Sequence, residues 1–164
     1  MALKGKIGGN TGFKCGIEKQ DLHFEGYMTQ DFIQLTFDRV VQTRAYTAIV
    51  LKSKEKRFAI FADAQVGKFL QLHLSGEERA RPQTPDLISS LFSCLDIEVK
   101  QLLINDLQDT TFFARLFLEM QRDGLRHIVE IDARPSDCIT LAFLHSAPVF
   151  CTRQVLEQAV PFVE

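Results

Sequence analysis

The sequence lacks most features that would assign it to a specialised class of protein. It contains no tryptophan, and its four cysteines form no Cys-x-x-Cys pair, which argues against a zinc or dithiol redox site. A net charge of -2 gives no overall attraction to polyanions. No run approaches the ~18 apolar residues of a membrane span, and no apolar signal segment opens the chain. We therefore expect a cytoplasmic protein with free thiols and no membrane partner.

The chain is about as long as one domain, but its first thirty residues differ from the rest. The segment GKIGGNTGFKCG holds five of the nine glycines and shows little hydrophobic periodicity. We expect residues 1–30 to form a flexible N-terminal lead-in and residues 31–164 a single domain. The 46% hydrophobic content is ordinary for a globular protein and sufficient for a core without disulfides or metal.

The first half of that domain predicts three strands and two helices. FIQLTF at 32–37 alternates like an edge strand, and YTAIVL and RFAIFA flank a polar turn as in a β-hairpin. Apolar spacing from Val66 to His73 predicts a helix that Gly76 ends. A second helix should begin at Thr84, as N-cap, and Pro85. Its apolar stripe comprises Leu87, Ile88, Leu91, Phe92 and Leu95.

The second half predicts a similar sequence of elements. It indicates, in order, a strand at 97–104, a turn at 105–109, a long strand, a hairpin turn at Asp123-Gly124, a return strand, a helix at 135–145, the short strand PVFC and a helix from Arg153. We therefore predict an α+β fold in which two related β-hairpin/helix units pack as one domain with a mixed sheet.

Two segments place arginine, proline and aspartate before an apolar run: RPQTPD at 81–86 and RPSD at 134–137. Proline and aspartate suit the first turn of a helix, which explains them by capping alone. The arginines need another reason, because positive charge at a helix N-terminus is unfavourable. In one interpretation Arg81 pairs with Asp137 or Asp132 and Arg134 with Asp86, locking the halves together. Alternatively, both arginines hold a phosphate beside helix-start N–H groups.

These segments resemble a known family. RPQTPDL, INDLQDTTFFARLFL and IDARPSDCITLA followed by APVF are similar, in that order, to motifs of the bifunctional nuclease family, small bacterial and plant domains described as degrading DNA and RNA. The resemblance spans about residues 46–160, and its most specific part is the second Arg-Pro-Ser-Asp segment.

The resemblance marks particular positions of this chain. They are Arg81, Thr84, Asp86, Asp106, Phe112, Arg134, Pro135, Ser136 and Asp137. The chain departs from the family pattern at Pro85, where members commonly carry histidine, and at Gln65, where they carry glutamate. If either missing group carries a proton or a metal, activity here is weakened or absent.

Phosphodiester hydrolysis requires charge stabilisation on the phosphoryl oxygens and an activated water. The candidate substrate-binding residues are Arg81, Thr84, Arg134 and Ser136, and the candidate catalytic carboxylates are Asp86, Asp137 and Asp106. Carboxylate oxygens would select Mg²⁺ or Mn²⁺, although no tight ligand motif is present. The alternative function is a non-catalytic oligomer of the same fold that binds an anionic ligand or a partner protein.

Phe113 and Phe117 occupy the more polar face of the long strand that starts near Phe112. Exposed rings on a sheet can stack nucleic-acid bases. Large apolar residues on both faces of a strand more often indicate a core or a subunit interface. We therefore expect a homo-oligomer, most simply a dimer, and the family resemblance implies DNA or RNA as its substrate.

Overall fold

The computed structural model describes residues 15–18, 31–77 and 81–163. In these ranges the chain forms eight strands and four helices. They are β1 (Cys15–Glu18), β2 (Phe32–Gln42), β3 (Thr47–Lys52), β4 (Arg57–Ala62), α1 (Ala64–Ser75), α2 (Thr84–Cys94), β5 (Ile97–Gln108), β6 (Thr111–Arg122), β7 (Leu125–Ala133), α3 (Pro135–Leu144), β8 (Val149–Thr152) and α4 (Arg153–Gln158).

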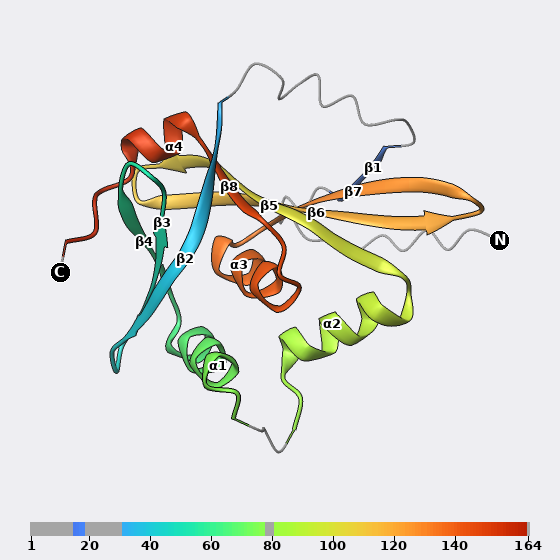
Figure 1. Cartoon of the computed structure of the whole chain (residues 1–164), viewed down its shortest axis with the longest axis horizontal. Helices are drawn as coiled ribbons and strands as arrows, with labels where there is room; N and C mark the ends of the chain where they lie inside the picture. Colours follow the sequence, from blue (N-terminus) through green and yellow to red (C-terminus); the bar gives the residue numbers. More distant parts are fainter. Residues whose placement is uncertain (1–14, 19–30, 78–80, 164) are drawn as a thin grey trace, which may run out of the picture.

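The strands form a mixed sheet in the order β1-β7-β6-β5-β8-β2-β3-β4. Two antiparallel meanders, β2-β3-β4 and β5-β6-β7, are joined by β8, which pairs parallel to β5 and antiparallel to β2 (Figure 1). The β3–β4 and β6–β7 hairpin turns lie where the sequence predicts them, with Asp123 and Gly124 at φ 55° and 72°. The predicted α+β fold with a mixed sheet is confirmed.

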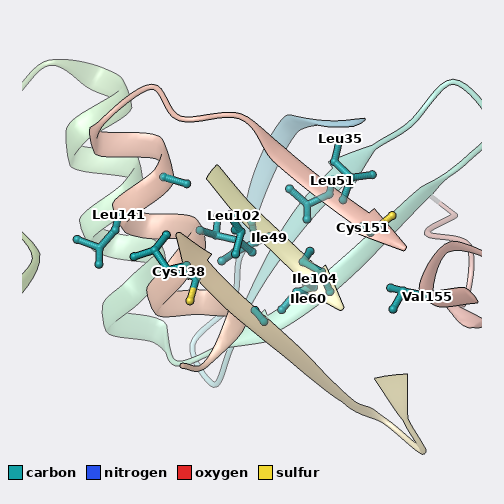
Figure 2. Packing of buried hydrophobic residues seen from close by; sticks show 14 of the residues in the cluster. Leu35, Ile49, Leu51, Ile60, Leu102, Ile104, Cys138, Leu141, Cys151 and Val155 are labelled. Carbon is teal, nitrogen blue, oxygen red and sulfur yellow. The ribbon is translucent and has the colours of Figure 1, made fainter. Parts of the chain in front are cut away.

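Helix α3 forms the centre of the core. Six of its ten residues are buried: Ser136, Cys138, Ile139, Thr140, Leu141 and Ala142. It packs on β5, β6 and β4, and also contacts α1 and α2. Figure 2 shows Cys138 and Leu141 of α3 on one side of the strands and Val155 of α4 beyond them on the other. The nearly uniform apolar character of this helix follows from contact on several sides.

The two meanders lead into their helices in the same way. β4 runs through Asp63 into α1, and β7 runs through Arg134 into α3, so that these two residues are the N-caps. In sequence, IFADAQ at 60–65 therefore corresponds to IDARPS at 131–136. The structural counterpart of the second Arg-Pro segment is thus the segment around Asp63, whereas RPQTPD follows α1 and begins the additional helix α2.

Three local predictions are wrong. β2 is not an edge strand, because it lies between β8 and β3 and extends to Gln42. Residues 105–108 continue β5 and do not turn, because residues 106–108 pair with residues 111–113 of β6. The Asp106 carboxylate accepts bonds from the Leu107 N–H and the Gln108 amide, at 2.8 Å each. The N-cap of α2 is Gln83, not Thr84.

The predicted lead-in falls largely on residues 1–14 and 19–30, which lie outside the described residues. Cys15–Glu18 are described and form β1, which pairs antiparallel with β7 along Ile128 to Ile131. This short strand therefore occupies one edge of the sheet.

Candidate functional site

An open cleft of about 690 Å³ lies where the two meanders enter their helices. The ends of β4 and β7 and the N-termini of α1 and α3 meet there, together with the β2–β3 and β5–β6 turns. Its walls are formed by Ala45, Tyr46, Ile60, Phe61, Ala62, Asp63, Thr110, Thr111, Phe112, Phe113, Asp132, Ala133, Arg134, Pro135 and Ser136. Both N-cap residues, Asp63 and Arg134, therefore belong to one site.

Arg134 is the cation of this cleft. Its Nε and Nη2 donate to the two carboxylate oxygens of Asp137, at 2.8 and 3.2 Å, and its Nη1 lies 3.5 Å from Asp63 Oδ2. The hydrogen bond and the charge of Asp137 raise the pKa of Arg134 above its ordinary value, with a smaller contribution from Asp63. The side chain is 67% exposed. Arg134 is thus oriented by a bidentate pair while remaining accessible to a ligand.

Ser136 and Asp132 place two further polar groups in the wall. Ser136 is only 7% exposed, and it lines the cleft in the first turn of α3. A serine hydroxyl in this position can donate a hydrogen bond to a phosphoryl oxygen. Asp132 stands near the end of β7, two residues before the N-cap of α3. The cleft therefore combines a hydroxyl, a guanidinium and two carboxylates.

The position of Asp63 depends on close packing behind it. At Gly67 of α1, an added Cβ would lie 2.1 Å from Thr47 Oγ1, so the helix lies directly against β3. Gln42 also donates from Nε2 to the Ala64 carbonyl at 3.0 Å. These contacts hold the first turn of α1 and thereby place Asp63 beside Arg134.

Cys138 stands directly after Asp137 but does not serve as a nucleophile. Burial raises the pKa of its thiol to about 12, and the charges of Asp137 and Asp132 act in the same direction. A nucleophilic cysteine requires a lowered pKa. Cys94, Cys138 and Cys151 are all free thiols.

The structure separates the seven predicted site residues. Arg134 and Ser136 line the cleft, and Asp137 reaches it through Arg134. Arg81 is exposed and is not among the lining residues, nor are Thr84 and Asp86. Asp86 Oδ2 instead accepts the Gln83 N–H at 2.7 Å, as a cap of α2. Asp106 forms the bonds within β5 described above.

The predicted ion pairs also differ from those observed. Arg134 pairs with Asp137 on its own helix and with Asp63, and not with Asp86. Because Asp137 in the first turn of α3 neutralises the Arg134 guanidinium and accepts its hydrogen bonds, no contact between the two Arg-Pro segments is needed.

Sequence analysis missed Asp63, Tyr46 and Phe61, which all line the cleft. One signal was present for Asp63, because it follows a strand and precedes a helix just as Arg134 does. Nothing local marks Tyr46 or Phe61, which resemble ordinary strand residues. Of the two phenylalanines considered for base stacking, Phe113 lines the cleft, whereas Phe117 is 5% exposed and therefore buried.

Among residues 15–18, 31–77 and 81–163, no group of three or more histidine, cysteine, aspartate or glutamate side chains is arranged to hold a metal ion. Asp63 and Asp132 are the carboxylates that line the cleft, and any ion there would need ligands from water or substrate as well. Within the same part of the chain, every helix is too short or too polar to cross a membrane.

The chain is similar to two proteins of Mycobacterium tuberculosis that are named only as uncharacterised, from strains CDC 1551 / Oshkosh and ATCC 25618 / H37Rv. Each is 29% identical over 123 residues, which cover 74% of this chain and 71% of the relative. The family model for the bifunctional nuclease domain matches residues 49–164, a span that includes most of the cleft and the whole α3 segment. The chain therefore belongs to the bifunctional nuclease domain family.

Proposed function

We propose that the cleft binds and hydrolyses phosphodiester bonds of DNA or RNA. One observation carries the proposal: Arg134 and Ser136 line the same open cleft as Asp63 and Asp132. The guanidinium and the hydroxyl can donate hydrogen bonds to a phosphoryl group, and the carboxylates can orient a water molecule or bind a metal ion. Membership of a nuclease domain family supports the same reaction class.

Arg134 and Ser136 would bind the phosphoryl oxygens. Asp137 fixes the plane of the guanidinium through two hydrogen bonds, so Arg134 meets its ligand without losing much side-chain freedom. The 3.5 Å contact with Asp63 is longer than either of these bonds. An incoming phosphate would replace it and free the Asp63 carboxylate.

Asp63 and Asp132 would act on the attacking water, either as general base or as ligands of Mg²⁺ or Mn²⁺. A divalent ion would lower the pKa of its bound water and neutralise the phosphoryl charge. Asp86 and Asp106, in contrast, use their carboxylates in a helix cap and in bonds within a strand. We assign those two residues structural roles.

The test measures whether purified protein cleaves plasmid DNA and one RNA of defined sequence. Each substrate is incubated with Mg²⁺ or Mn²⁺ and, separately, with EDTA to remove divalent ions. Arg134→Ala, Asp132→Asn and Asp137→Ala should each lose activity. Arg122→Ala, at the exposed end of the β6–β7 hairpin and outside the cleft, is the matched control and should keep it. Equal activity in all four proteins would identify a contaminating nuclease and contradict the proposal.

A second candidate is a non-catalytic protein that binds an anionic ligand or a partner protein at the same cleft. Pro85 and Gln65 favour it, because family members commonly carry ionisable groups at these two positions. Binding of labelled RNA that Arg134→Ala abolishes, together with no cleavage under any metal condition, would select this candidate.

We infer further that the protein acts in the cytoplasm as a homodimer. Free thiols on Cys94, Cys138 and Cys151 are typical of a reducing compartment. One side of α2 leaves Leu87, Leu91 and Leu95 more than half exposed, as an apolar column that a second subunit would cover. The oligomeric state is tested below.

A further inference from the structure

Two aromatic side chains at the edge of the cleft are unusually exposed. Tyr46 is 46% exposed and Phe61 is 66% exposed, and both line the cleft. Their ring centroids lie 5.5 Å apart with the rings inclined at 75°. Neighbouring apolar rings left in water at the edge of a pocket are typical of a surface that binds an apolar partner.

The backbone holds both rings in place. Tyr46 ends a tight turn in which Thr43 N–H donates to the Tyr46 carbonyl at 2.9 Å and Thr43 Oγ1 accepts the Tyr46 N–H at 3.1 Å. Phe61 belongs to β4 and pairs in register with Ala48 of β3. A ligand would therefore meet a preformed surface and would not have to order a loop.

Phe61 is linked to the phosphate-binding groups through Asp63. Phe61 lies near the end of β4, two residues before Asp63, which has extended backbone as the N-cap of α1, and both residues line the cleft. Asp63 in turn contacts Arg134. The aromatic pair and the Arg134 guanidinium therefore line one cleft and are connected through Asp63.

We propose that Tyr46 and Phe61 form a base-stacking subsite that receives one unpaired base next to the phosphate held by Arg134 and Ser136. This inference rests on the proposed function and adds its substrate class, single-stranded DNA or RNA. A paired base inside a duplex cannot present its face to Phe61. Phenylalanine has no hydrogen-bonding group, so the subsite tolerates any base.

The experiment measures binding of a fluorescein-labelled hexathymidylate and of a hairpin duplex by fluorescence anisotropy, in EDTA, with probe integrity checked on a gel. Phe61→Ala should bind the single strand about ten- to a hundred-fold more weakly, since each stacked base contributes strongly to affinity. Tyr46→Ala should act in the same direction, and Phe61→Tyr should restore binding. Duplex binding should be unchanged by all three.

Leu125→Ala is the control, because Leu125 is 64% exposed but lies outside the cleft. If Phe61→Ala binds the single strand as the wild type does while Arg134→Ala does not, the stacking subsite is wrong and the phosphate site stands. If the wild-type protein binds neither probe, the proposed function itself fails. A change from dimer to monomer in Phe61→Ala would show that the rings form a subunit contact and would overturn the inference.

Discussion

Arg134 depends on Asp137 for its orientation, and this dependence can be measured separately from folding. The two side chains are 67% and 46% exposed, so their pair should contribute no more than about 1 kcal/mol to stability. Asp137→Asn keeps the shape but loses the charge and one acceptor. We predict that kcat/KM on a single-stranded substrate falls roughly ten- to a hundred-fold. A variant that melts several degrees lower yet cleaves normally would contradict a positioning role.

Gly67 is the residue whose substitution should reveal how tightly α1 packs on β3. In an exposed helix, Gly→Ala is stabilising by about 1 kcal/mol. Here the new methyl would meet Thr47 Oγ1 at 2.1 Å, and overpacking of this kind costs about 1–3 kcal/mol. We predict that Gly67→Ala lowers the free energy of unfolding, measured in urea, and that it also lowers activity by moving Asp63.

A double substitution separates the clash from other effects of alanine. Thr47→Ala removes the two nearest atoms that the new methyl meets, Oγ1 at 2.1 Å and Cγ2 at 2.7 Å, so Gly67→Ala should cost less stability in that background. Gly76→Ala is the matched control, since Gly76 has φ 69° and open space around it. Gly76→Ala should lower the free energy of unfolding through backbone strain alone, by the same amount in the wild type and in the Thr47→Ala background. Purely additive effects for Gly67→Ala and Thr47→Ala would show that the two residues are not in tight contact.

At the scale of elements, α2 is attached to α3 through a histidine. His145, the C-cap of α3, lies 3.0 Å from Ser89 Oγ of α2 through Nε2, and its ring packs on Phe92. Burial lowers the pKa of His145 below its ordinary 6.5. The unfolded chain therefore binds a proton more readily than the folded one. Stability is retained above pH 6.5 and is lost as the pH falls from there toward the folded-state pKa.

We predict that the midpoint of urea unfolding decreases between pH 7.5 and pH 5.5 and that His145→Gln reduces this decrease. His73→Gln is the control, because the His73 ring packs on Phe69 of its own helix and on Phe143 of α3, away from the contact between His145 and Ser89. If wild type and His145→Gln show the same pH dependence, His145 does not carry the effect.

Local patterns predicted most elements because most of them are stabilised locally. The KSKEK turn between alternating strands and the spacing from Val66 to Gly76 each specify one structure. β2 could not be placed in the sheet interior, because its neighbour β8 comes from residues more than a hundred positions later. Similarly, the polar Asn105 and Asp106 resemble a turn, but Asp106 pairs with Phe113 of β6 and Asn105 lies at a bulge within the strand.

The part of the candidate site that depends on local sequence could be predicted, and the part that depends on tertiary structure could not. RPSD marks Arg134 and Ser136, because a strand followed by proline predicts a helix start. Arg81 could not be placed from local sequence, because its distance from Arg134 depends on tertiary structure. The sheet instead brings the end of β4 to α3, so that Asp63 is the residue that contacts Arg134. Capping preferences make RPQTPD and RPSD similar in sequence, although only RPSD belongs to the cleft.

At the scale of the whole molecule, α2 is the least covered helix. None of its residues is buried, and Leu87, Leu91 and Leu95 are 58%, 51% and 59% exposed. We predict that the protein is a dimer in light scattering at micromolar concentration and that Leu91→Lys makes it monomeric. Ser90→Lys, one residue away, should leave the dimer intact if the leucine column forms the interface. A monomeric wild type would contradict this assembly.

The proposed function requires a phosphate site at the start of α3 and not at the start of α2. The most direct test is a ¹H–¹⁵N NMR titration with thymidine 3′,5′-bisphosphate. We predict shifts of the Ser136, Asp63 and Phe61 amide signals that saturate with one affinity, and unchanged Thr84 and Asp86 signals. Shifts confined to Thr84 and Asp86, or no saturable shift in either segment, would contradict it.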